Sequence, residues 1–592
     1  MSGTRLIRFA PSLRKPCSFS TLRGAGLLLL LASLLLPPAW GDATQRDDDR
    51  QAGRRRFFEL TRRFEEERDK IPLERADTIR ELGSLKMSAA VQFLAGVLEK
   101  PKENGIVKEA VLRALGTDGS EEAVEAILTL GFSELPKRSW RVAGEALKTF
   151  HDPSGIEWVV ERGWKQIPGL EPEAQQIFVG VLRRTQDERS AAASYKLLGN
   201  PKCPPETQLG LVKIVRDFRH MRSKKKLARL FKINDAPLKV EVLLALQELQ
   251  ATEHSKLFRT ALRSRHWQVR AVGADIYGHT HDPELIPEIT PLLLDDSQPV
   301  QVAAVQALRR IGGEGVMDAL VEALASVGGR VKDDIGDALL HLTGEDLGPG
   351  PIAWKIWWKE NRGTAKIAGI SREEFDRIRK ESEGGKTGVY YGLRVISDYV
   401  TFVVDVSGSM EEPYMVPIED ESEKEESEGR TGVSKKKGKK KKRKWEKKTK
   451  IQVAKDELAR VLDGLRRGTD FNLITFSGAF TLWKPHLVEM TEGIREEAVA
   501  FTRSLSPGGM TNVYDTLKAA LKDPQVNTIY FLSDGSPTMG TFTDTETILE
   551  KVAEANQLRK VKIHTIGFHL DPQAEELMRR LAEENFGSFV KK

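Results

Sequence analysis

Apolar and polar residues follow a helical period over a long central part of the chain, and the pattern repeats. From about residue 80 to residue 345, small or branched residues recur beside apolar ones with separations of 32, 35, 33, 31, 29, 33 and 31 residues. The recurring positions are Ala114-Leu115, Ala146-Leu147, Val181-Leu182, Ile214-Val215, Ala245-Leu246, Ala274, Ala307-Leu308 and Ala338-Leu339. Each interval has room for two short helices. Because two such helices cannot bury their shared face alone, we predict stacked pairs, an α-solenoid over residues 80–362.

The turns between these paired helices carry an Asp-Pro signal at Asp152-Pro153 and Asp282-Pro283. This spacing and these turns resemble HEAT repeats of the short kind. Trp354, Trp357 and Trp358 follow the last unit on one helical face. We interpret this tryptophan-rich segment as a cap over the last repeat, with an aromatic patch for carbohydrate or peptide as the alternative.

Two shorter regions flank the repeats. Residues 42–79 are highly charged, and their phenylalanines and Leu60 are spaced for one helical face, which indicates a solvated helix or a short coiled segment. Residues 363–397 are expected to be a linker with one polar helix at Ser371–Glu383.

From Tyr399 onward, strand-like segments alternate with helical ones. The expected strands are 399–405, 470–476, 480–488, 527–532, 562–568 and 588–590, and the expected helices are 451–465, 495–505, one from near 513, and 572–584. Such alternation predicts an α/β domain over residues 398–592, with a mostly parallel sheet covered on both faces. Ligands of such sheets collect at the carboxyl ends of the strands.

The first 41 residues have the order of a secretory signal peptide. They hold five basic residues and no acid, an apolar run at 25–36, and small residues at Ala39 and Gly41. We expect cleavage after Gly41 and a secreted or periplasmic protein. An uncleaved membrane anchor and a mitochondrial presequence are the alternatives. No second apolar run of membrane length occurs, so the mature chain is expected to have no membrane span.

Charge and cysteine content limit the other functions. Removing the five basic residues of the leader lowers the formal net charge from +6 to +1, so global charge gives no argument for nucleic-acid binding. Cys203 is then the only cysteine, which excludes an internal disulfide and a cysteine-based metal site.

Oxygen-bearing side chains cluster where three predicted loops follow strands. Asp405, Ser407 and Ser409 alternate on a loop that Gly408 can kink, Thr511 lies in a glycine-rich turn, and Asp534 follows the strand at 527–532. Hard divalent cations prefer such oxygen ligands. The alternative is that these residues only cap helices and end strands.

This order of motifs resembles the von Willebrand factor A family. The resemblance implies a metal-ion-dependent adhesion site in which Asp405, Ser407, Ser409, Thr511 and Asp534 hold the ion, directly or through water. It implies Mg²⁺, with Mn²⁺ or Ca²⁺ as alternatives, and a protein partner whose acidic side chain completes the shell. The whole arrangement is similar to secreted HEAT-plus-A-domain proteins of planctomycete-type bacteria, a likeness that implies architecture and no activity.

A binding or scaffolding protein is therefore expected, with the solenoid as a second surface and no catalysis. A metal-dependent hydrolase is one alternative, but its usual motifs are absent from the sequence, and His486, His564 and His569 are expected in core or surface roles. An accessory subunit of a larger assembly, such as one that docks onto an ATPase, is another alternative.

Residues 411–449 form an insertion after the first metal-site loop. Residues 411–428 hold nine acids and one lysine, whereas residues 435–450 hold twelve basic residues and one acid. This composition predicts a disordered loop. It is either a tolerated insertion or a regulator whose acidic half donates a carboxylate to the metal. Its lysine-rich half could bind an anionic polymer such as nucleic acid or acidic polysaccharide.

Overall fold

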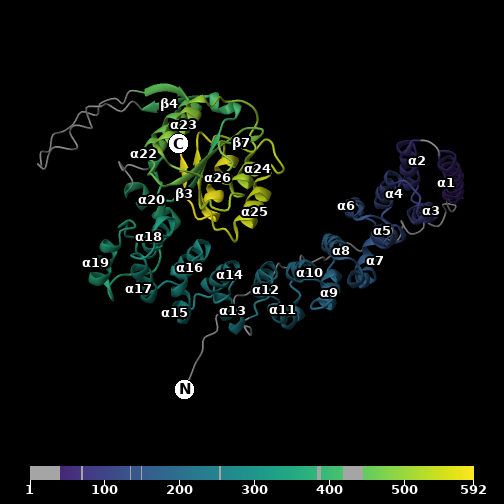
Figure 1. The fold of residues 1–592 in the computed structure, drawn as a ribbon, viewed down its shortest axis with the longest axis horizontal. Coiled ribbons are helices and arrows are strands. Elements are labelled where there is room, and N and C mark those ends of the chain that lie inside the picture. Colours follow the sequence, from purple (N-terminus) through teal and green to yellow (C-terminus); the bar gives the residue numbers. More distant parts are fainter. Residues whose placement is uncertain are drawn as a thin grey trace, which may run out of the picture. The chain divides into compact units, whose positions relative to one another are not determined.

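The computed structural model describes residues 40–68, 71–133, 135–148, 150–251, 255–382, 389–417 and 445–592 (Figure 1). Most of the predicted signal peptide, with its apolar run at 25–36, lies outside these residues, and so does the centre of the predicted insertion, residues 418–444. Within the described ranges, no helix has the length and hydropathy that crossing a membrane requires. The chain divides into two compact units, Met1–Arg189 and Ser190–Lys592.

The first unit is a helical array with two rows. In one row α2, α4, α6 and α8 pack in succession, and in the other α3, α5 and α7 do so. The elements are α1 (Trp40–Glu66), α2 (Pro72–Ser84), α3 (Ser88–Glu99), α4 (Gly105–Asp118), α5 (Glu121–Ser133), α6 (Lys137–Ala146), α7 (Pro153–Glu161), η1 (Gly163–Gly169) and α8 (Pro172–Arg184).

The predicted charged segment 42–79 belongs to this array. Helix α1 buries Leu60 and Phe64, and the Phe64 ring meets the Phe93 ring edge-on at 5.6 Å. The Arg75 guanidinium lies 4.1 Å from the centre of the Phe64 ring. The segment is helical, and Leu60 and Phe64 pack on neighbouring helices, whereas Phe58 stays exposed.

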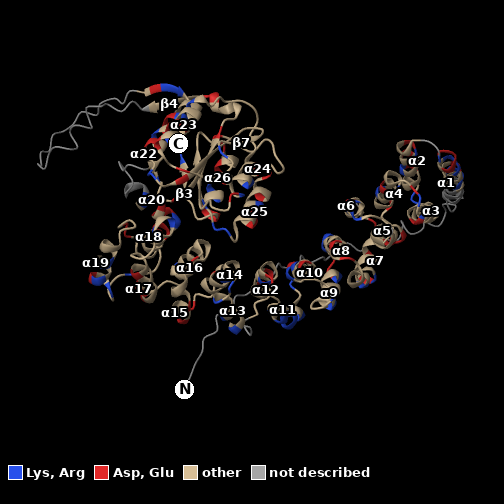
Figure 2. Cartoon of the chain, in the orientation of Figure 1, with Lys and Arg blue, Asp and Glu red and all other residues tan. Residues whose placement is uncertain are grey.

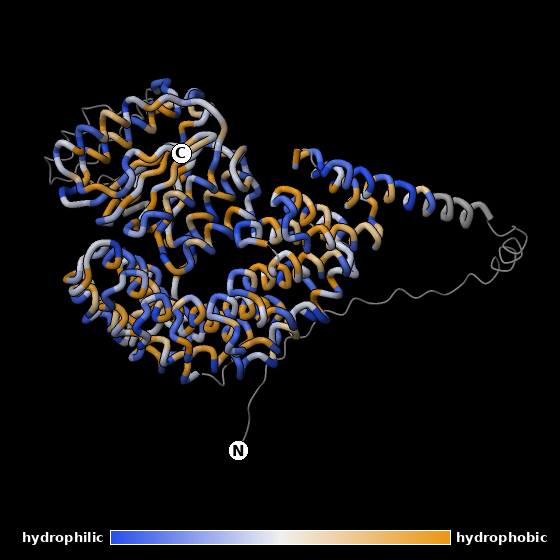
Figure 3. The backbone as a smooth tube through the Cα atoms, turned by 45° about the vertical axis from the view of Figure 1, so that its right-hand side comes forward, coloured by the Kyte–Doolittle hydropathy of each residue, from blue (hydrophilic) through white to orange (hydrophobic). Residues whose placement is uncertain are grey.

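The second unit continues with the same kind of helix pairs, in which α10, α12, α14, α16 and α18 pack in succession. The elements are α9 (Arg189–Leu197), α10 (Pro205–Asp217), η2 (Met221–Ser223), α11 (Lys224–Leu230), α12 (Ala236–Glu248), α13 (Ser255–Leu262), α14 (Trp267–Gly278), η4 (Pro283–Leu285), α15 (Ile286–Ile289), η5 (Thr290–Leu294), α16 (Gln298–Ile311), α17 (Glu314–Ala323) and α18 (Gly329–Thr343). The α-solenoid prediction is confirmed. Figure 3 shows apolar stretches alternating with polar ones along these helices.

Close helix contacts explain the recurring small residues. A Cβ atom on Gly116 of α4 would lie 2.6 Å from the carbonyl oxygen of Ala146 in α6, and one on Gly278 of α14 would lie 2.6 Å from the Cα of Ala307 in α16. Both alanines belong to the recurring pairs seen in the sequence. Larger side chains at these crossings would separate neighbouring repeats, because close-packed interiors tolerate little added volume.

The tryptophan-rich segment forms α19 (Pro351–Asn361), which packs on α17. Trp354 and Trp358 are buried, and the indole nitrogen of Trp358 donates to Asp318 Oδ1 of α17 at 2.8 Å. This burial accords with the cap interpretation rather than with an exposed aromatic patch.

The C-terminal part of the second unit is an α/β domain built on a seven-stranded sheet. Its strand order is β11-β10-β9-β3-β6-β7, with β8 also paired to β6. Neighbours from β11 to β6 are parallel, whereas β7 and β8 run antiparallel to β6. The strands are β3 (Tyr399–Asp405), β6 (Asp470–Phe476), β7 (Phe480–Leu482), β8 (Val488–Glu489), β9 (Thr528–Ser533), β10 (Lys562–Gly567) and β11 (Phe589–Lys591). The predicted mostly parallel sheet is confirmed.

Helices cover both faces of this sheet and enclose two separate cores. One core lies beneath α22 (Lys450–Gly464) and α23 (Glu492–Ser504), and includes Phe402 and Tyr530. The other lies beneath α24 (Val513–Ala520), α25 (Thr545–Asn556) and α26 (Pro572–Glu584). Helix α25 was not expected from the sequence, although its Asp544 N-cap and its apolar residues at helical spacing mark it.

The α/β domain begins earlier than the sequence predicts. The predicted linker holds α20 (Arg372–Ser382) as expected, but its last part forms the small hairpin β1 (Val389–Tyr390) and β2 (Leu393–Arg394). Tyr390 and Leu393 are buried in the core beneath α22. The boundary at residue 398 is therefore about nine residues too late, because the two short strands carry no long apolar pattern.

The two ends of the predicted disordered insertion are ordered. Strands β4 (Pro413–Pro417) and β5 (Trp445–Thr449) pair antiparallel, with Pro413 opposite Thr449 and Pro417 opposite Trp445. Figure 2 shows the charged residues on this ribbon, where β5 carries Glu446, Lys447 and Lys448. The prediction of disorder is wrong for these ends, since backbone pairing there depends little on the side-chain charges that point outward.

Candidate metal centre

Two adjacent parallel strands bring the first acidic groups of the site together. Asp405 is the last residue of β3 and Ser533 the last residue of β9, and the two strands pair directly. The Ser533 hydroxyl donates to Asp405 Oδ2 at 2.6 Å. Asp405 and Asp534 are both buried, so this carboxyl edge holds two carboxyl groups away from water.

The loop after β3 folds back over this edge. The Ser407 backbone N–H donates to Asp405 Oδ1 at 2.8 Å, and the Ser407 and Ser409 hydroxyl oxygens lie 3.1 Å apart. The Ser409 hydroxyl donates to Asp534 Oδ1 at 2.7 Å. Hydrogen bonds therefore join the side chains of Ser407, Ser409 and Asp534, and the Ser407 backbone links Asp405 to them.

Thr511 belongs to the third loop, which lies against the first through its backbone. Gly408 N–H donates to the Gly509 carbonyl at 3.1 Å, and Gly508 N–H donates to the Val406 carbonyl at 2.8 Å. Thr511 is buried, and its own N–H donates to the Thr538 hydroxyl at 2.8 Å. Within the described ranges, no hydrogen bond links the Thr511 hydroxyl to the other four predicted ligands.

The donor set fits a small hard cation. Two adjacent ligand oxygens of octahedral Mg²⁺, each about 2.1 Å from the ion, lie about 3 Å apart. The oxygen separations of 2.7 and 3.1 Å around Ser409 are of this size. The groups that would hold Mg²⁺ are thus already gathered.

Burial disfavours the ionised form of Asp405. Removal from water raises the pKa of Asp405 to about 6, although hydrogen bonds from Ser533 and Ser407 favour its charged form. The nearby charge of Asp534 raises the pKa further. A cation at this edge would relieve both penalties.

A buried lysine that sequence reasoning missed lies beside the same edge. Lys450 begins α22, and its ammonium lies 2.9 Å from Asp534 Oδ2 and 2.7 Å from Glu412 Oε2. Burial lowers the pKa of Lys450, but hydrogen bonds to these two carboxylates outweigh it, and the net shift is upward. Thr449 and Gln452 form a capping box that fixes this end of α22. A capping-box pattern at Thr449 was the available signal, hidden at the end of a lysine run.

The three histidines considered in the sequence form no hydrogen bond to the five predicted ligands in the described residues, although His569 helps to lower the pKa of Glu412. His564 is buried in β10, where its ring stacks on Tyr530 at 4.9 Å and its Nδ1 accepts from the Ser588 N–H at 3.1 Å. His486 and His569 are exposed. These positions agree with the expected core and surface roles.

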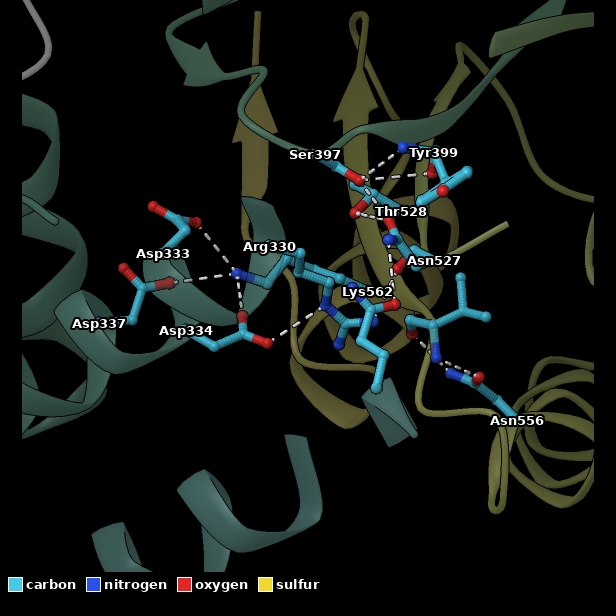
Figure 4. A network of polar contacts seen from close by, with 12 residues as sticks. Arg330, Asp333, Asp334, Asp337, Ser397, Tyr399, Asn527, Thr528, Asn556 and Lys562 are labelled. Carbon is cyan, nitrogen blue, oxygen red and sulfur yellow. Dashed lines mark hydrogen bonds and ion pairs between the residues drawn. The ribbon is translucent and has the colours of Figure 1, made fainter. Parts of the chain in front are cut away.

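A second acidic group lies at the opposite, amino-terminal edge of the sheet (Figure 4). Oxygens of Asp333, Asp334 and Asp337 on α18 lie within 4.8 Å of one another, and the Lys562 ammonium at the start of β10 is 3.2, 2.6 and 3.2 Å from them. Arg330 pairs with Asp334 at 3.2 Å, and Arg379 pairs with Asp337 at 2.8 Å. We name these three aspartates and three cations the α18 cluster.

Comparisons with known proteins match both parts of the chain. Residues 254–339 match a family model for HEAT repeats, and residues 446–590 match a model for the von Willebrand factor type A domain. The C-terminal domain is a von Willebrand factor type A domain. We refer to it below as the A domain.

Individual relatives match limited parts of this chain. Human von Willebrand factor A domain-containing protein 3B is 28% identical over 24% of this chain and 11% of its own length. Inter-alpha-trypsin inhibitor heavy chain H3 of Mesocricetus auratus is 29% identical over 30% of this chain and 17% of its own length. A solved von Willebrand factor type A structure from Catenulispora acidiphila covers 33% of this chain and 38% of its own, at 15% identity and a TM-score of 0.24. The chain thus spans less than a fifth of the two curated relatives.

Proposed function

We propose that the A domain binds a divalent cation at Asp405, Ser407, Ser409, Thr511 and Asp534, and binds a protein partner through it. The observation that carries this proposal is the hydrogen-bonded convergence of four oxygen-bearing side chains at one sheet edge. Mg²⁺ is the proposed ion, with Mn²⁺ and Ca²⁺ as alternatives. When bound, the ion would supply a positive centre for an incoming acidic group.

The local charge favours an acidic partner. Asp405 and Asp534 carry two negative charges when ionised, and the Lys450 ammonium offsets one of them. Among these three buried groups a divalent ion would leave a net charge of +1; the exposed Glu412 carboxylate, which also contacts Lys450, is not counted. A carboxylate from a partner protein neutralises that charge, which supports binding rather than permanent saturation by the chain itself.

We propose that this edge catalyses no reaction. A general base works best with a pKa near the working pH. Burial raises the pKa of Asp405 to about 6, but as a proposed ligand of the ion its carboxylate would not be free to act as a base. Of the other ionisable neighbours, the pKa of Lys450 is raised and that of Glu412 is lowered, so neither approaches neutrality. The family likeness supports a protein-interaction role, whereas a hydrolase or an accessory subunit has no comparable contact in its favour.

The remaining parts of the chain fit a scaffold. We propose that the HEAT array offers a second interaction surface and that the lysine-rich residues 435–450 bind an anionic polymer. Export through the leader at 1–41 to the periplasm or outside is also a proposal. Amino-terminal sequencing of the purified native protein tests it: residue 42 is the expected first residue, and an intact leader contradicts export by cleavage.

The function is tested by a pull-down. The full chain is immobilised and incubated with the extracellular or periplasmic fraction of the native cells, in the presence of Mg²⁺ or of EDTA. A partner retained only with Mg²⁺ and lost with Asp405→Asn is expected. Asp463→Asn is the matched control, because Asp463 is an exposed aspartate of the same domain near the end of α22. Capture that is equal with EDTA, or equal on the Asp405→Asn chain, contradicts the metal-dependent role.

A further inference from the structure

A pocket of about 370 Å³ lies in the second unit where α16, α18, α20 and the segment after α26 meet. Its walls include three arginines, one histidine and two phenylalanines: Arg309, Arg310, His341, Arg372, Phe375 and Phe586. The volume is in the range of sites for small ligands. The pocket is remote in sequence from the metal-site loops, and neither the fold nor the proposed function accounts for the three arginines in its wall.

The acidic residues in the pocket wall already have cations. Asp334 and Asp337 belong to the α18 cluster, where Lys562 contacts both. At the exposed rim, Glu583 pairs with Arg579 at 3.0 Å and Glu584 pairs with Arg580 at 3.0 Å. These carboxylates therefore leave little charge for the arginines that line the pocket.

The arginines of the pocket wall differ in whether an acidic side chain pairs with them. Arg372 donates to Asp376 at 3.1 Å and to the Gly587 carbonyl at 2.8 Å. Arg309, at the end of α16, donates through Nε to the neutral Gln306 amide oxygen at 3.1 Å. No acidic side chain in the described part of the chain forms an ion pair with Arg309. A largely buried guanidinium without a counter-ion is costly, so this charge calls for an anion.

Arg310 is also incompletely satisfied. Its Nη1 lies 3.7 Å from Asp275 Oδ1, and the other oxygen of Asp275 is 2.5 Å from the Lys560 ammonium. Buried Arg310 Nη1 has no hydrogen-bond partner among the described residues, and neither has His341 Nδ1. Buried polar atoms are nearly always hydrogen-bonded, so two orphans in one pocket wall indicate a missing partner.

Like charges repel one another across this pocket. Burial lowers the pKa of His341 to about 4, and the charges of Arg309 and Arg372 lower it further. Burial likewise lowers the pKa of Arg309, helped by Arg310 and Arg372 and only partly opposed by Asp337. An anion placed among these groups would relieve the repulsion as well as the missing hydrogen bonds.

We propose that this pocket binds a small oxyanion, the carboxylate or phosphate group of a small ligand, held by Arg309 with Arg310 and His341 beside it. Planar guanidinium groups recognise both kinds of oxyanion through paired hydrogen bonds. Phe375 and Phe586 provide apolar surface for the carbon part of such a ligand. Because Arg309 comes from the HEAT array and Phe586 from the A domain, the ligand contacts both.

The test uses the full chain in calorimetric titrations with inorganic phosphate and with succinate, at constant ionic strength and with chloride as the reference. Saturable binding of at least one probe is expected, and Arg309→Gln should weaken it at least about tenfold. Arg309→Lys keeps the charge but loses the planar fork, and should bind with intermediate affinity. Arg229→Gln is the matched control, because Arg229 is an exposed arginine in the last turn of the solenoid helix α11.

Thermal unfolding without ligand distinguishes loss of a site from loss of the fold. Arg309→Gln should be at least as stable as the wild type, since it removes an uncompensated charge. Phosphate binding alone identifies a phosphate site, and succinate binding alone a carboxylate site. The proposal is overturned if neither probe binds the wild type saturably, or if Arg309→Gln binds them as well as Arg229→Gln does.

Discussion

The A domain sheet has an acidic cluster at each edge, and the two are neutralised in different ways. At the amino-terminal edge, the three aspartates of the α18 cluster are matched by Lys562, Arg330 and Arg379. At the carboxyl edge, Asp405 and Asp534 face serine hydroxyls and one ammonium, that of Lys450. The first edge holds as many cations as acids, whereas the second holds one cation for two buried acids and the exposed Glu412.

This difference separates a structural cluster from a binding site. Three aspartate oxygens close together could themselves hold a metal ion, but Lys562 already occupies the position between them (Figure 4). Its charge joins α18 of the HEAT array to β10 of the A domain. At the carboxyl edge, serine hydroxyl groups donate hydrogen bonds to the carboxylates but do not neutralise their charge. An added cation could therefore neutralise it.

The largest effect on stability should come from removing Lys562 from the amino-terminal edge, where cations and acids are equal in number. Lys562→Ala leaves two buried carboxylates and the half-buried Asp337 with two arginines, and should lower the free energy of unfolding by about 3–5 kcal/mol. Chemical denaturation of the full chain measures it. Lys551→Ala, on the half-exposed surface of α25, is the control and should cost less than about 1 kcal/mol. A loss for Lys562→Ala as small as the control's would mean that the α18 cluster contributes little.

Removing an acid from the carboxyl edge should change the free energy of unfolding in the opposite direction. We call this edge, with its two buried acids and one cation, the open edge. Without metal at pH 7, Asp405→Asn should raise the free energy of unfolding by about 1–3 kcal/mol, because burial raises the pKa of Asp405 to about 6. The same denaturation experiment, with EDTA present, measures it. A clear destabilisation by Asp405→Asn would place Asp405 with the structural acids of the other edge.

Of the two edges, only the carboxyl edge could be predicted from the sequence. A strand ending in Asp405, the alternating serines and the strand-terminal Asp534 follow a local pattern, so their meeting could be predicted from parallel strand ends. The α18 cluster joins residues about 225 positions apart, such as Asp337 and Lys562. No local pattern encodes that contact, since it depends on how the HEAT array packs against the sheet.

Lys450 shows a different limit. It is the last of twelve basic residues between 435 and 450, and composition alone assigns the whole run to solvent. The β4–β5 ribbon and the capping box at Thr449 turn this one side chain inward. The unexpected order at the ends of the insertion and the missed lysine thus have one physical origin.

Making the open edge more acidic should strengthen the metal site. Lys450→Met removes the ammonium beside Asp534 while keeping the length of the side chain, and should raise the affinity for Mg²⁺ by about tenfold. Calorimetry on the full chain measures it. Lys522→Met, at an exposed position of the same domain, should leave the affinity unchanged. Weaker Mg²⁺ binding by Lys450→Met would show that Lys450 positions Asp534 rather than competes for it.

Low pH should weaken Mg²⁺ binding at the carboxyl edge, because it protonates Asp405. Because a proton must leave this carboxyl group before it binds a cation, the affinity for Mg²⁺ should fall as pH drops below about 6. In the metal-free protein, the raised pKa of Asp405 means that the stability from this group is fully present below about pH 3.8 and is lost as pH rises through about 6. Titrations across this range test both statements, and an affinity independent of pH between 5 and 7 would contradict them.

The smallest effect is expected from shortening the insertion. Deleting residues 418–444 and joining β4 to β5 with a two-residue turn keeps the ribbon and Lys450, and should change stability by less than about 1 kcal/mol. If the acidic residues 419–428 donate a carboxylate to the metal, the deletion should increase Mg²⁺-dependent partner capture. Unchanged capture would leave the insertion as a tolerated loop and end the inhibitory hypothesis.

The most direct test is a calorimetric titration of Mg²⁺ into the full chain at pH 7.5, with acetate present as a source of carboxylate. The account predicts one saturable site per chain in the wild type and in Asp463→Asn, and none in Asp405→Asn. Heat of binding that is absent from the wild type, or that persists in Asp405→Asn, would contradict a metal centre at the carboxyl edge of the sheet.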